Sequence, residues 1–327
     1  MTFSKDEYHP DLRPYVGRLM LIPLVTKYKW SVRFANAVTD LLYKGKDTKG
    51  LDCQQVFIPS RDSGVSIRAR IYRPVYRPEG KHKDLPVMLY LHGGGYMLGC
   101  PEQAEGYIKS FIDKRPCVVI APAYRRSHTQ PFPAGFNDCY DSLLWVKRNA
   151  VQLGVRADKF IIAGHSAGGG LTAAITLKAR DTGDFNIAFQ MPFYPMIDDQ
   201  QPTDAARNMN TPVWNSMSNA NGWRAYLANL DQETTEVSVY AAPARNKDYA
   251  NFPPTISFVG DKEPFYRETL DYVQALEAEN IDVTFKVYPG CFHAFDLVAP
   301  KADISKDALE FTYQSYADFY DKYFDFL

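Results

Sequence analysis

A serine between two glycines carries the strongest chemical signal in the sequence. It lies in Gly164-His165-Ser166-Ala167-Gly168-Gly169, directly after the apolar run 160–163 and before a helical pattern over 166–180. A Gly-x-Ser-x-Gly turn between a strand and a helix exposes the serine hydroxyl for attack on an acyl carbon. Its glycines admit close backbone neighbours, and the N-terminus of the following helix favours negative charge beside the serine. We therefore predict that Ser166 is a nucleophile rather than an ordinary N-cap serine.

A run of three glycines supplies a second signal. It follows the apolar run 87–91, which we count as the third strand. Three glycines after a buried strand cost conformational entropy, but they free backbone N–H groups to point at a single oxygen. Together with the N–H of the residue after the nucleophile, they can form an oxyanion hole, in which losing one donor typically costs roughly 3–4 kcal/mol of transition-state stabilisation. The predicted oxyanion-hole residues are Gly93, Gly94, Gly95 and Ala167.

The general base must be a histidine within reach of this serine. Of the six histidines, only His293 lies downstream of Ser166, and it follows the alternating pattern 282–288 and a Pro289-Gly290 turn. In hydrolases with this type of serine turn, the acid and then the histidine follow the nucleophile along the chain. His293 is therefore the predicted base.

The acidic partner of that histidine is less sharply marked. Asp261 and Glu263 both follow the strand pattern 255–260. Either carboxylate can hold the imidazole in the required tautomer and stabilise the imidazolium that forms during acyl transfer. The residues alone leave both acids open.

Alternating strand and helix patterns position these residues. Residues 1–45 are amphipathic with helical spacing, and 56–58 with 65–72 alternate as an antiparallel pair with one wet face. Short apolar runs typical of strands buried on both faces lie at 87–91, 117–121, 160–163, 187–189 and 255–259. Helical patterns lie at 137–152, 166–180 and 265–279. The alternation predicts an α/β fold with a mostly parallel central sheet flanked by helices.

Two stretches interrupt this rhythm. Residues 79–84 read as a charged turn, and 198–250 is polar, contains prolines and is too long for a simple connection. The longer stretch also contains Trp214, Trp223 and Tyr226. We predict that it is an inserted subdomain.

Several of these segments together resemble the hormone-sensitive-lipase family of α/β-hydrolases, in particular its bacterial acetyl- and carboxylesterase branch. The similar segments are His92-Gly93-Gly94-Gly95-Tyr96, Tyr124-Arg125, Pro131-Phe132-Pro133-Ala134, Gly164 to Gly169, Tyr194-Pro195, and Tyr288-Pro289-Gly290 through His293-Ala294-Phe295. They run from about residue 86 to residue 296 in the family's order. The resemblance implies the α/β-hydrolase fold with a helical cap over the serine.

The resemblance also bears on individual site residues. In the family the acid lies three residues after the glycine that closes its strand, which here selects Glu263 over Asp261, although the family usually has Asp at that position. It further implies that Gly94 and Gly95 donate to the oxyanion while Gly93 shapes the turn. The implied catalytic triad is Ser166, Glu263 and His293.

The chain departs from the family at two places. The variable residue of the serine turn is often Asp in the family but is His165 here, which we interpret as a packing residue rather than a base. After Tyr124-Arg125 the family tends to have Leu-Ala-Pro-Glu, whereas this chain has Arg126-Ser127-His128-Thr129. Pocket contacts are therefore not carried over from this stretch.

The implied cap divides the chain into four parts. In order, these are N-terminal cap helices (1–50), the first part of the hydrolase core (51–197), a cap insertion (198–250) and the second part of the core (251–327). Four aromatic residues are the predicted lining of the substrate pocket: Tyr96, Trp214, Trp223 and Tyr226. Alternatively, the three from the insertion only attach the cap to the sheet.

Composition limits the class of protein further. The 327 residues carry 37 basic and 38 acidic side chains, a net charge of −1, and this balance argues against a nucleic-acid partner. The longest apolar stretch near the N-terminus spans seven residues and contains a proline, so we expect neither a membrane span nor an export signal. Five scattered cysteines indicate reduced thiols and a cytoplasmic protein.

These observations favour an enzyme over a binding module. The expected reaction is two-step acyl transfer on a small-molecule ester, with neither a metal nor an organic cofactor and with a homodimer left open. The lack of a long apolar stretch that would adsorb to lipid favours short acyl groups, from acetyl to hexanoyl, over long triglycerides. Two alternatives stay open: an amidase or peptidase on the same fold, and a non-catalytic ligand-binding relative, which is expected to lack the late histidine.

Overall fold

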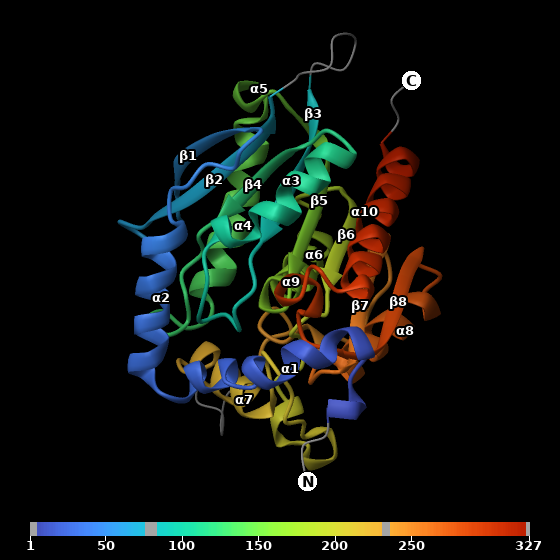
Figure 1. Ribbon diagram of the computed structural model, residues 1–327. Helices are drawn as coiled ribbons and strands as arrows, with labels where there is room; N and C mark the ends of the chain where they lie inside the picture. The colour runs from blue at the N-terminus through green and yellow to red at the C-terminus, as the bar shows by residue number, and fades with distance from the viewer. Residues whose placement is uncertain (1–4, 76–83, 231–235, 325–327) are drawn as a thin grey trace.

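In the part of the chain that the structure describes, eight strands form one sheet (Figure 1). The computed structural model describes residues 5–75, 84–230 and 236–324. Within them the strands are β1 (Leu51–Pro59), β2 (Ser66–Pro74), β3 (Leu85–Leu91), β4 (Val118–Pro122), β5 (Val155–His165), β6 (Ile187–Phe193), β7 (Thr255–Lys262) and β8 (Val283–Phe292). Their order is β1-β2-β4-β3-β5-β6-β7-β8; β2 is antiparallel to β1 and β4, and the other neighbouring pairs are parallel. The predicted antiparallel pair and mostly parallel sheet are confirmed.

Helices cover both faces of the sheet. On one face lie α4 (Ala134–Arg148), α6 (Ala167–Thr182) and α8 (Tyr266–Ala278), and on the other lie α3 (Glu105–Lys114) and α10 (Asp303–Tyr323). The other α-helices are α1 (Arg13–Leu19), α2 (Lys29–Tyr43), α5 (Ala150–Leu153), α7 (Ser216–Tyr226) and α9 (Phe295–Val298). Short 3₁₀ turns are η1 (Lys5–Glu7), η2 (Pro10–Leu12), η3 (Ile22–Lys27), η4 (Pro101–Ala104), η5 (Gln201–Thr203), η6 (Ala205–Arg207) and η7 (Pro243–Arg245). The sequence patterns predict α4, α6 and α8 but not α3 or α10.

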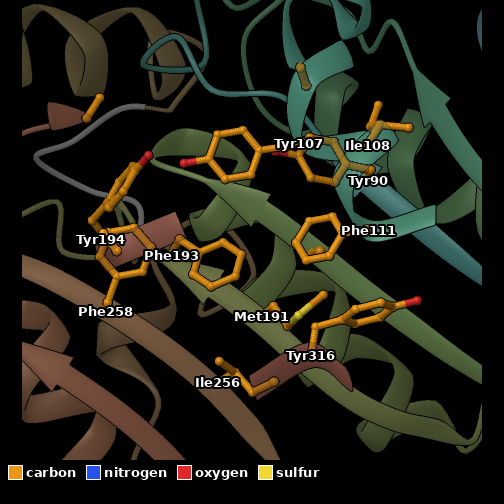
Figure 2. Packing of buried hydrophobic residues seen from close by; sticks show 14 of the residues in the cluster. Tyr90, Tyr107, Ile108, Phe111, Met191, Phe193, Tyr194, Ile256, Phe258 and Tyr316 are labelled. Atoms are coloured by element: carbon orange, nitrogen blue, oxygen red, sulfur yellow. The ribbon is translucent and has the colours of Figure 1, made fainter. Parts of the chain in front are cut away.

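Aromatic side chains fill the space between the sheet and helices α3 and α10 (Figure 2). Phe111 of α3 lies against Tyr90 of β3 and meets Tyr316 of α10 edge to face, with 4.9 Å between ring centroids. Burying a side chain of this size contributes roughly 1.5–3 kcal/mol. Phe193, at the end of β6, belongs to the same cluster. This packing fixes the strand ends beside the predicted nucleophile.

The strand before the predicted base is longer than expected. The sequence predicts that Pro289-Gly290 is a turn that ends it, but β8 continues through both residues. The Gly290 N–H donates to the carboxylate of Asp261 (2.6 Å), and the Gly290 carbonyl accepts from the N–H of His9 (2.8 Å). These two partners satisfy the backbone of Gly290, whose φ is 71°, and the pairing of β8 with β7 shifts register between Tyr288 and Phe292. The strand therefore contains an irregularity at the predicted turn but continues to Phe292, directly before His293.

The other local predictions have mixed outcomes. The helix predicted over 137–152 is divided into α4 and α5, because Asn149 lies outside the helical region of backbone space. The charged turn predicted at 79–84 lies, apart from residue 84, outside the described residues. All five cysteines have free thiols, as predicted. None of the helices in the described ranges combines the length and apolar character that crossing a bilayer requires.

The N-terminal helices and the inserted segment meet over one end of the sheet. The η3 turn packs against α7, where the Thr26 hydroxyl donates to that of Ser218 (3.2 Å). Val25 and Trp214, one from each segment, line the same cavity as Ser166. Of the insertion, residues 231–235 lie outside the described part of the chain. The division into cap and core segments stays a prediction.

Candidate active site

Ser166 lies in the turn that joins β5 to α6. Its backbone takes φ 59° and ψ −121°, a conformation that costs energy for a residue with a side chain. The Ser166 N–H donates to the carbonyl of Phe193 (3.0 Å), and the Ser166 carbonyl accepts from the N–H of Met196 (3.0 Å). A Cβ at Gly168 would overlap the carbonyl oxygen of Leu91, so the turn needs a glycine there. Sequence and backbone thus agree on a strained strand-to-helix turn.

Two further side chains converge on this serine. The Ser166 hydroxyl lies 2.9 Å from Nε2 of His293, and Nδ1 of His293 lies 2.5 Å from Oε2 of Glu263. Glu263 is fully buried, and its other oxygen accepts from the Gly260 N–H (3.1 Å). A carboxylate at Nδ1 keeps the ring proton on that nitrogen, which leaves Nε2 free to accept the hydroxyl proton. The geometry is that of a nucleophile, a base and an orienting acid.

The two candidate acids have different positions. Glu263 contacts His293, whereas the carboxylate of Asp261 accepts from the backbone N–H of Gly290 in β8. Asp261 therefore ties the end of β7 to the neighbouring strand. Of the two acids that the residues leave open, the structure brings Glu263 to the imidazole.

The glycine loop after β3 faces the same serine. Among the described residues, the N–H groups of Gly94, Gly95 and Ala167 have no backbone or side-chain partner. The loop is held from behind by Tyr124, whose hydroxyl donates to the carbonyl of His92 (2.7 Å) and whose ring stacks on that imidazole. Three unpaired donors beside the serine can stabilise a developing oxyanion.

A cavity of about 540 Å³ opens above the serine. Its walls come from the glycine loop, η3, α2, α3, α9 and the end of β3. Lining side chains that the sequence analysis does not identify include Ile22, Val25, Tyr43, Tyr90, Tyr107, Tyr194 and Leu297. Residues on η3 and α2 show only a helical period, which does not reveal what their inner face covers.

Only one of the four predicted pocket aromatics lines this cavity. Trp214 does, with its ring packed on Gly95 so closely that a Cβ there would overlap it. Tyr96, Trp223 and Tyr226 do not, and the prediction is wrong for them. Tyr96 has φ 62° and stacks on Tyr226, with 3.9 Å between ring centroids, and both belong to the buried cluster with Trp223. Trp223 and Tyr226 pack with Tyr96 and hold the inserted segment against the core, which is the alternative proposed for the aromatic residues of the insertion.

His165 is buried beside the nucleophile. Its Nδ1 is hydrogen-bonded to the hydroxyl of Tyr90, and its ring packs edge-on against Tyr107, with 4.0 Å between centroids. Burial lowers the pKa of His165 to about 3, with a smaller contribution from His293, so the ring is neutral at physiological pH. The structure thus agrees with a packing residue and gives no contact to the Ser166 hydroxyl. The Nε2 of His165 has no hydrogen-bond partner in the described part of the chain.

The stretch that departs from the family pattern attaches α2 to the core. Arg126 donates to the carboxylate of Asp40 (2.9 Å) and to the side-chain oxygen of Asn36 (2.8 Å), both on α2. The side-chain amide of Asn36 in turn donates to the carbonyl of Met97 (2.9 Å). Asn36 and Asp40 therefore face inward, and Asn36 contacts the segment that follows the glycine loop.

Asp296 is a buried carboxyl group beside the site, and its burial changes its pKa. Its carboxylate accepts from the hydroxyl of Tyr194 (3.1 and 3.2 Å), whose ring meets His293 edge to face. Burial raises the pKa of Asp296 to about 7. The carboxyl ionises near pH 4 in the unfolded chain, so the folded state binds the extra proton between about pH 4 and pH 7, and stability falls as the pH rises through that window.

Asp296→Asn should remove most of this pH-dependent loss of stability, because the amide does not ionise. The free energy of unfolding of the parent should fall by up to about 4 kcal/mol more than that of the variant between pH 4 and pH 8. Urea unfolding of both proteins at several pH values measures the difference. Parallel pH profiles would contradict the raised pKa.

The serine turn, the histidine beside it and the sheet order define an α/β-hydrolase. The chain matches the alpha/beta hydrolase fold family over residues 88–297 and belongs to it, as its motifs predict. It is 30% identical over 218 residues to esterase LipI of Mycobacterium tuberculosis, covering 66% of this chain and 67% of the relative. It is 30% identical over 236 residues to carboxylesterase NlhH of the same species, covering 70% and 73%. Among solved structures, a bacterial heroin esterase has a TM-score of 0.84 and 26% identity, covering 97% of this chain and 99% of that one.

Proposed function

We propose that this chain is a serine carboxylesterase that hydrolyses short-chain acyl esters through a covalent acyl-enzyme. The observation that carries the proposal is the distance of 2.9 Å between Oγ of Ser166 and Nε2 of His293. The names of the esterase relatives support the reaction class. The triad of Ser166, Glu263 and His293 is part of the proposal.

The reaction follows the positions of the groups. His293 accepts the proton of Ser166 as Oγ attacks the ester carbonyl, and the new oxyanion is stabilised by the N–H groups of Gly94, Gly95 and Ala167. The imidazolium then protonates the leaving alcohol, and the acyl group stays on the serine. A water molecule repeats the attack, with His293 again taking a proton, and the acid is released.

The size of the cavity supports short acyl groups. Its volume of about 540 Å³ lies within the range of pockets that hold a small ligand. A short ester fits such a space, whereas each added methylene group needs more of it. We therefore place the preferred acyl length between acetyl and hexanoyl.

A chain-length series tests the reaction and the acyl preference together. p-Nitrophenyl esters from acetyl to dodecanoyl, with a matched p-nitroanilide, should show the highest kcat/KM for the short esters and much slower hydrolysis of the amide. A maximum at the longest ester would refute the acyl preference. Faster hydrolysis of the amide would favour the amidase alternative.

Trp214 should set the acyl length that the cavity accepts. Trp214→Ala removes a ring that lies on Gly95 and 6.5 Å from the ring of His293, so the cavity grows beside the reacting centre. We expect the ratio of kcat/KM for the hexanoyl ester to kcat/KM for the acetyl ester to rise about tenfold. A change of this size is what accommodating one or two further methylene groups in an apolar pocket contributes.

Trp223→Ala is the matched control for this variant. Trp223 is a buried tryptophan of the same inserted segment, but it lies outside the cavity lining. Both variants should lose roughly 3–5 kcal/mol of stability, whereas only Trp214→Ala should change the chain-length ratio. Equal ratios in the two variants would show that Trp214 does not limit the pocket.

A further inference from the structure

Exposed apolar side chains are concentrated in one part of the molecule. Of the fourteen large hydrophobic residues that are exposed in the described part of the chain, ten lie between residues 21 and 43. Trp30, Phe34 and Leu41 are 68%, 66% and 83% exposed. The sequence alone predicts no such surface, because the same spacing fits a helix that buries these residues. A concentration of large exposed apolar side chains of this kind is typical of an interaction site in a folded protein.

Helix α2 turns two polar side chains inward and leaves several large apolar side chains exposed. Asn36 and Asp40 face the core, where both accept hydrogen bonds from Arg126. Trp30, Phe34 and Leu41 follow one another at intervals of four and seven residues, so they share one face of the helix. Helix α2 lies at the edge of the molecule (Figure 1). The inward hydrogen bonds fix the orientation, so the outer face cannot turn inward to bury its apolar side chains.

Basic residues lie in the same stretch of the chain as these apolar residues, on α2 and on either side of it. Six of them are exposed and form no ion pair with any described residue: Lys27, Lys29, Arg33, Lys44, Lys46 and Lys49. The acids within 21–49 are Asp40 and Asp47, and each is paired with an arginine from elsewhere in the chain, Arg126 and Arg70. The segment therefore has an excess of uncompensated positive charge, although the whole chain carries a net charge of −1.

We propose that this part of the protein binds an anionic lipid surface. We call it the docking face and define it by two groups of residues: the apolar Leu21, Leu24, Tyr28, Trp30, Phe34 and Leu41, and the six basic residues above. An apolar helix face with Lys and Arg beside it inserts its side chains at the boundary of headgroups and acyl chains, while the cations pair with lipid phosphates. The long lysine stems allow both contacts at once.

Charge favours a lipid surface over a second copy of the chain. Two docking faces brought together would set unpaired cations against unpaired cations in a low-dielectric interface, and like charges across an interface weaken binding. An anionic lipid surface instead compensates them. The inner sides of the same elements, at Ile22, Val25 and Tyr43, line the cavity above Ser166. Docking would therefore hold the cavity close to the lipid, whichever ester the enzyme hydrolyses.

Vesicle binding tests the proposal. The full chain is sedimented with vesicles of phosphatidylcholine alone and of phosphatidylcholine mixed with phosphatidylglycerol, at low and high salt. We expect binding to the anionic vesicles at low salt, weakened on the order of tenfold or more at high salt because exposed charges are screened. Trp30 emission should shift to the blue on binding, and the shift should be lost in Trp30→Phe.

Variants distinguish vesicle binding through the docking face from nonspecific adsorption. Trp30→Ser/Phe34→Ser/Leu41→Ser should reduce vesicle binding on the order of 100-fold, whereas hydrolysis of a soluble short ester should stay unchanged because none of the three residues lines the cavity. Phe57→Ser/Val151→Ser removes exposed apolar residues elsewhere and should bind like the parent. Retained hydrolysis also shows that the triple variant folds.

Three results would overturn the proposal. The first is no binding to anionic vesicles, and the second is equal binding by the parent and the triple variant. The third is a parent dimer, measured by sedimentation velocity, that dissociates in the triple variant, because this would assign the face to a second copy. Since hydrolysis of the soluble ester is followed separately, failure of the esterase proposal is distinguished from failure of this one.

Discussion

Ser166→Ala should lower kcat for p-nitrophenyl acetate on the order of 10⁶-fold, as removal of the nucleophile does in other serine triads. The hydroxyl lies 2.9 Å from Nε2 of His293, and the unpaired N–H groups of Gly94, Gly95 and Ala167 are placed to act on the oxygen of its tetrahedral adduct. Without Oγ, no acyl-enzyme forms. Only water attack within the site then remains, supported by substrate binding and the oxyanion donors.

A serine elsewhere in the fold controls for loss of a buried hydroxyl. The Ser142 hydroxyl is buried in α4 and donates to the carbonyl of Asp138 (2.7 Å), and Ser142 lies outside the cavity lining. Ser142→Ala should lose on the order of 1 kcal/mol of stability and keep its kcat. A fluorophosphonate should label the parent and Ser142→Ala at Ser166, and should leave Ser166→Ala unlabelled. Ester turnover by Ser166→Ala near the parent value would refute the proposed nucleophile.

Short sequence motifs predict the reacting centre because its geometry requires particular residue types at neighbouring positions in the chain. The serine turn needs glycine where backbone atoms approach, as at Gly168 against the Leu91 carbonyl. The glycine loop follows a strand with a continuous apolar run, and the late histidine follows a strand with an alternating pattern. A parallel sheet brings the carboxyl ends of its strands to one edge, so the sequence also indicates that these segments meet.

The cavity is not predictable in the same way. Its walls combine η3, α2, Trp214 and Leu297, which are far apart in the chain and share no motif. Tyr96 illustrates the difficulty: it follows the glycine loop directly, but its positive φ turns the ring away from the cavity and onto Tyr226. Aromatic residues in a loop near the site indicate burial, and only the backbone conformation decides which side of the loop they occupy.

Helix α2 was equally ambiguous from sequence. An amphipathic period predicts two faces, and the usual expectation places the apolar one inward. Here Arg126 draws Asn36 and Asp40 inward, and the large apolar residues remain outside. The side that a helix buries depends on partners supplied by distant loops, which no local pattern contains.

The residues alone left two candidates for the acid of the triad, Asp261 and Glu263, and these have different contacts in the structure. Glu263→Gln keeps the shape of the side chain but removes the charge that holds the proton on Nδ1 of His293. We expect kcat to fall on the order of 10⁴-fold, because the amide can favour the wrong tautomer and cannot stabilise the imidazolium. Asp261→Asn should change kcat only a few-fold, since its carboxylate accepts from the Gly290 N–H, whereas the imidazole contacts Glu263.

The ratio between these two variants decides the assignment. Both acids follow β7 and both substitutions remove one negative charge, so a general electrostatic effect on the cavity would lower kcat similarly in each. Only direct contact with Nδ1 makes the losses differ by several powers of ten. Glu263→Asp adds a second comparison: it keeps the charge but shortens the side chain by about 1.5 Å, and should therefore also lose activity. If Asp261→Asn were the more damaged variant, the chain would need a rearrangement of the β7 end during catalysis, and the triad proposed here would be wrong.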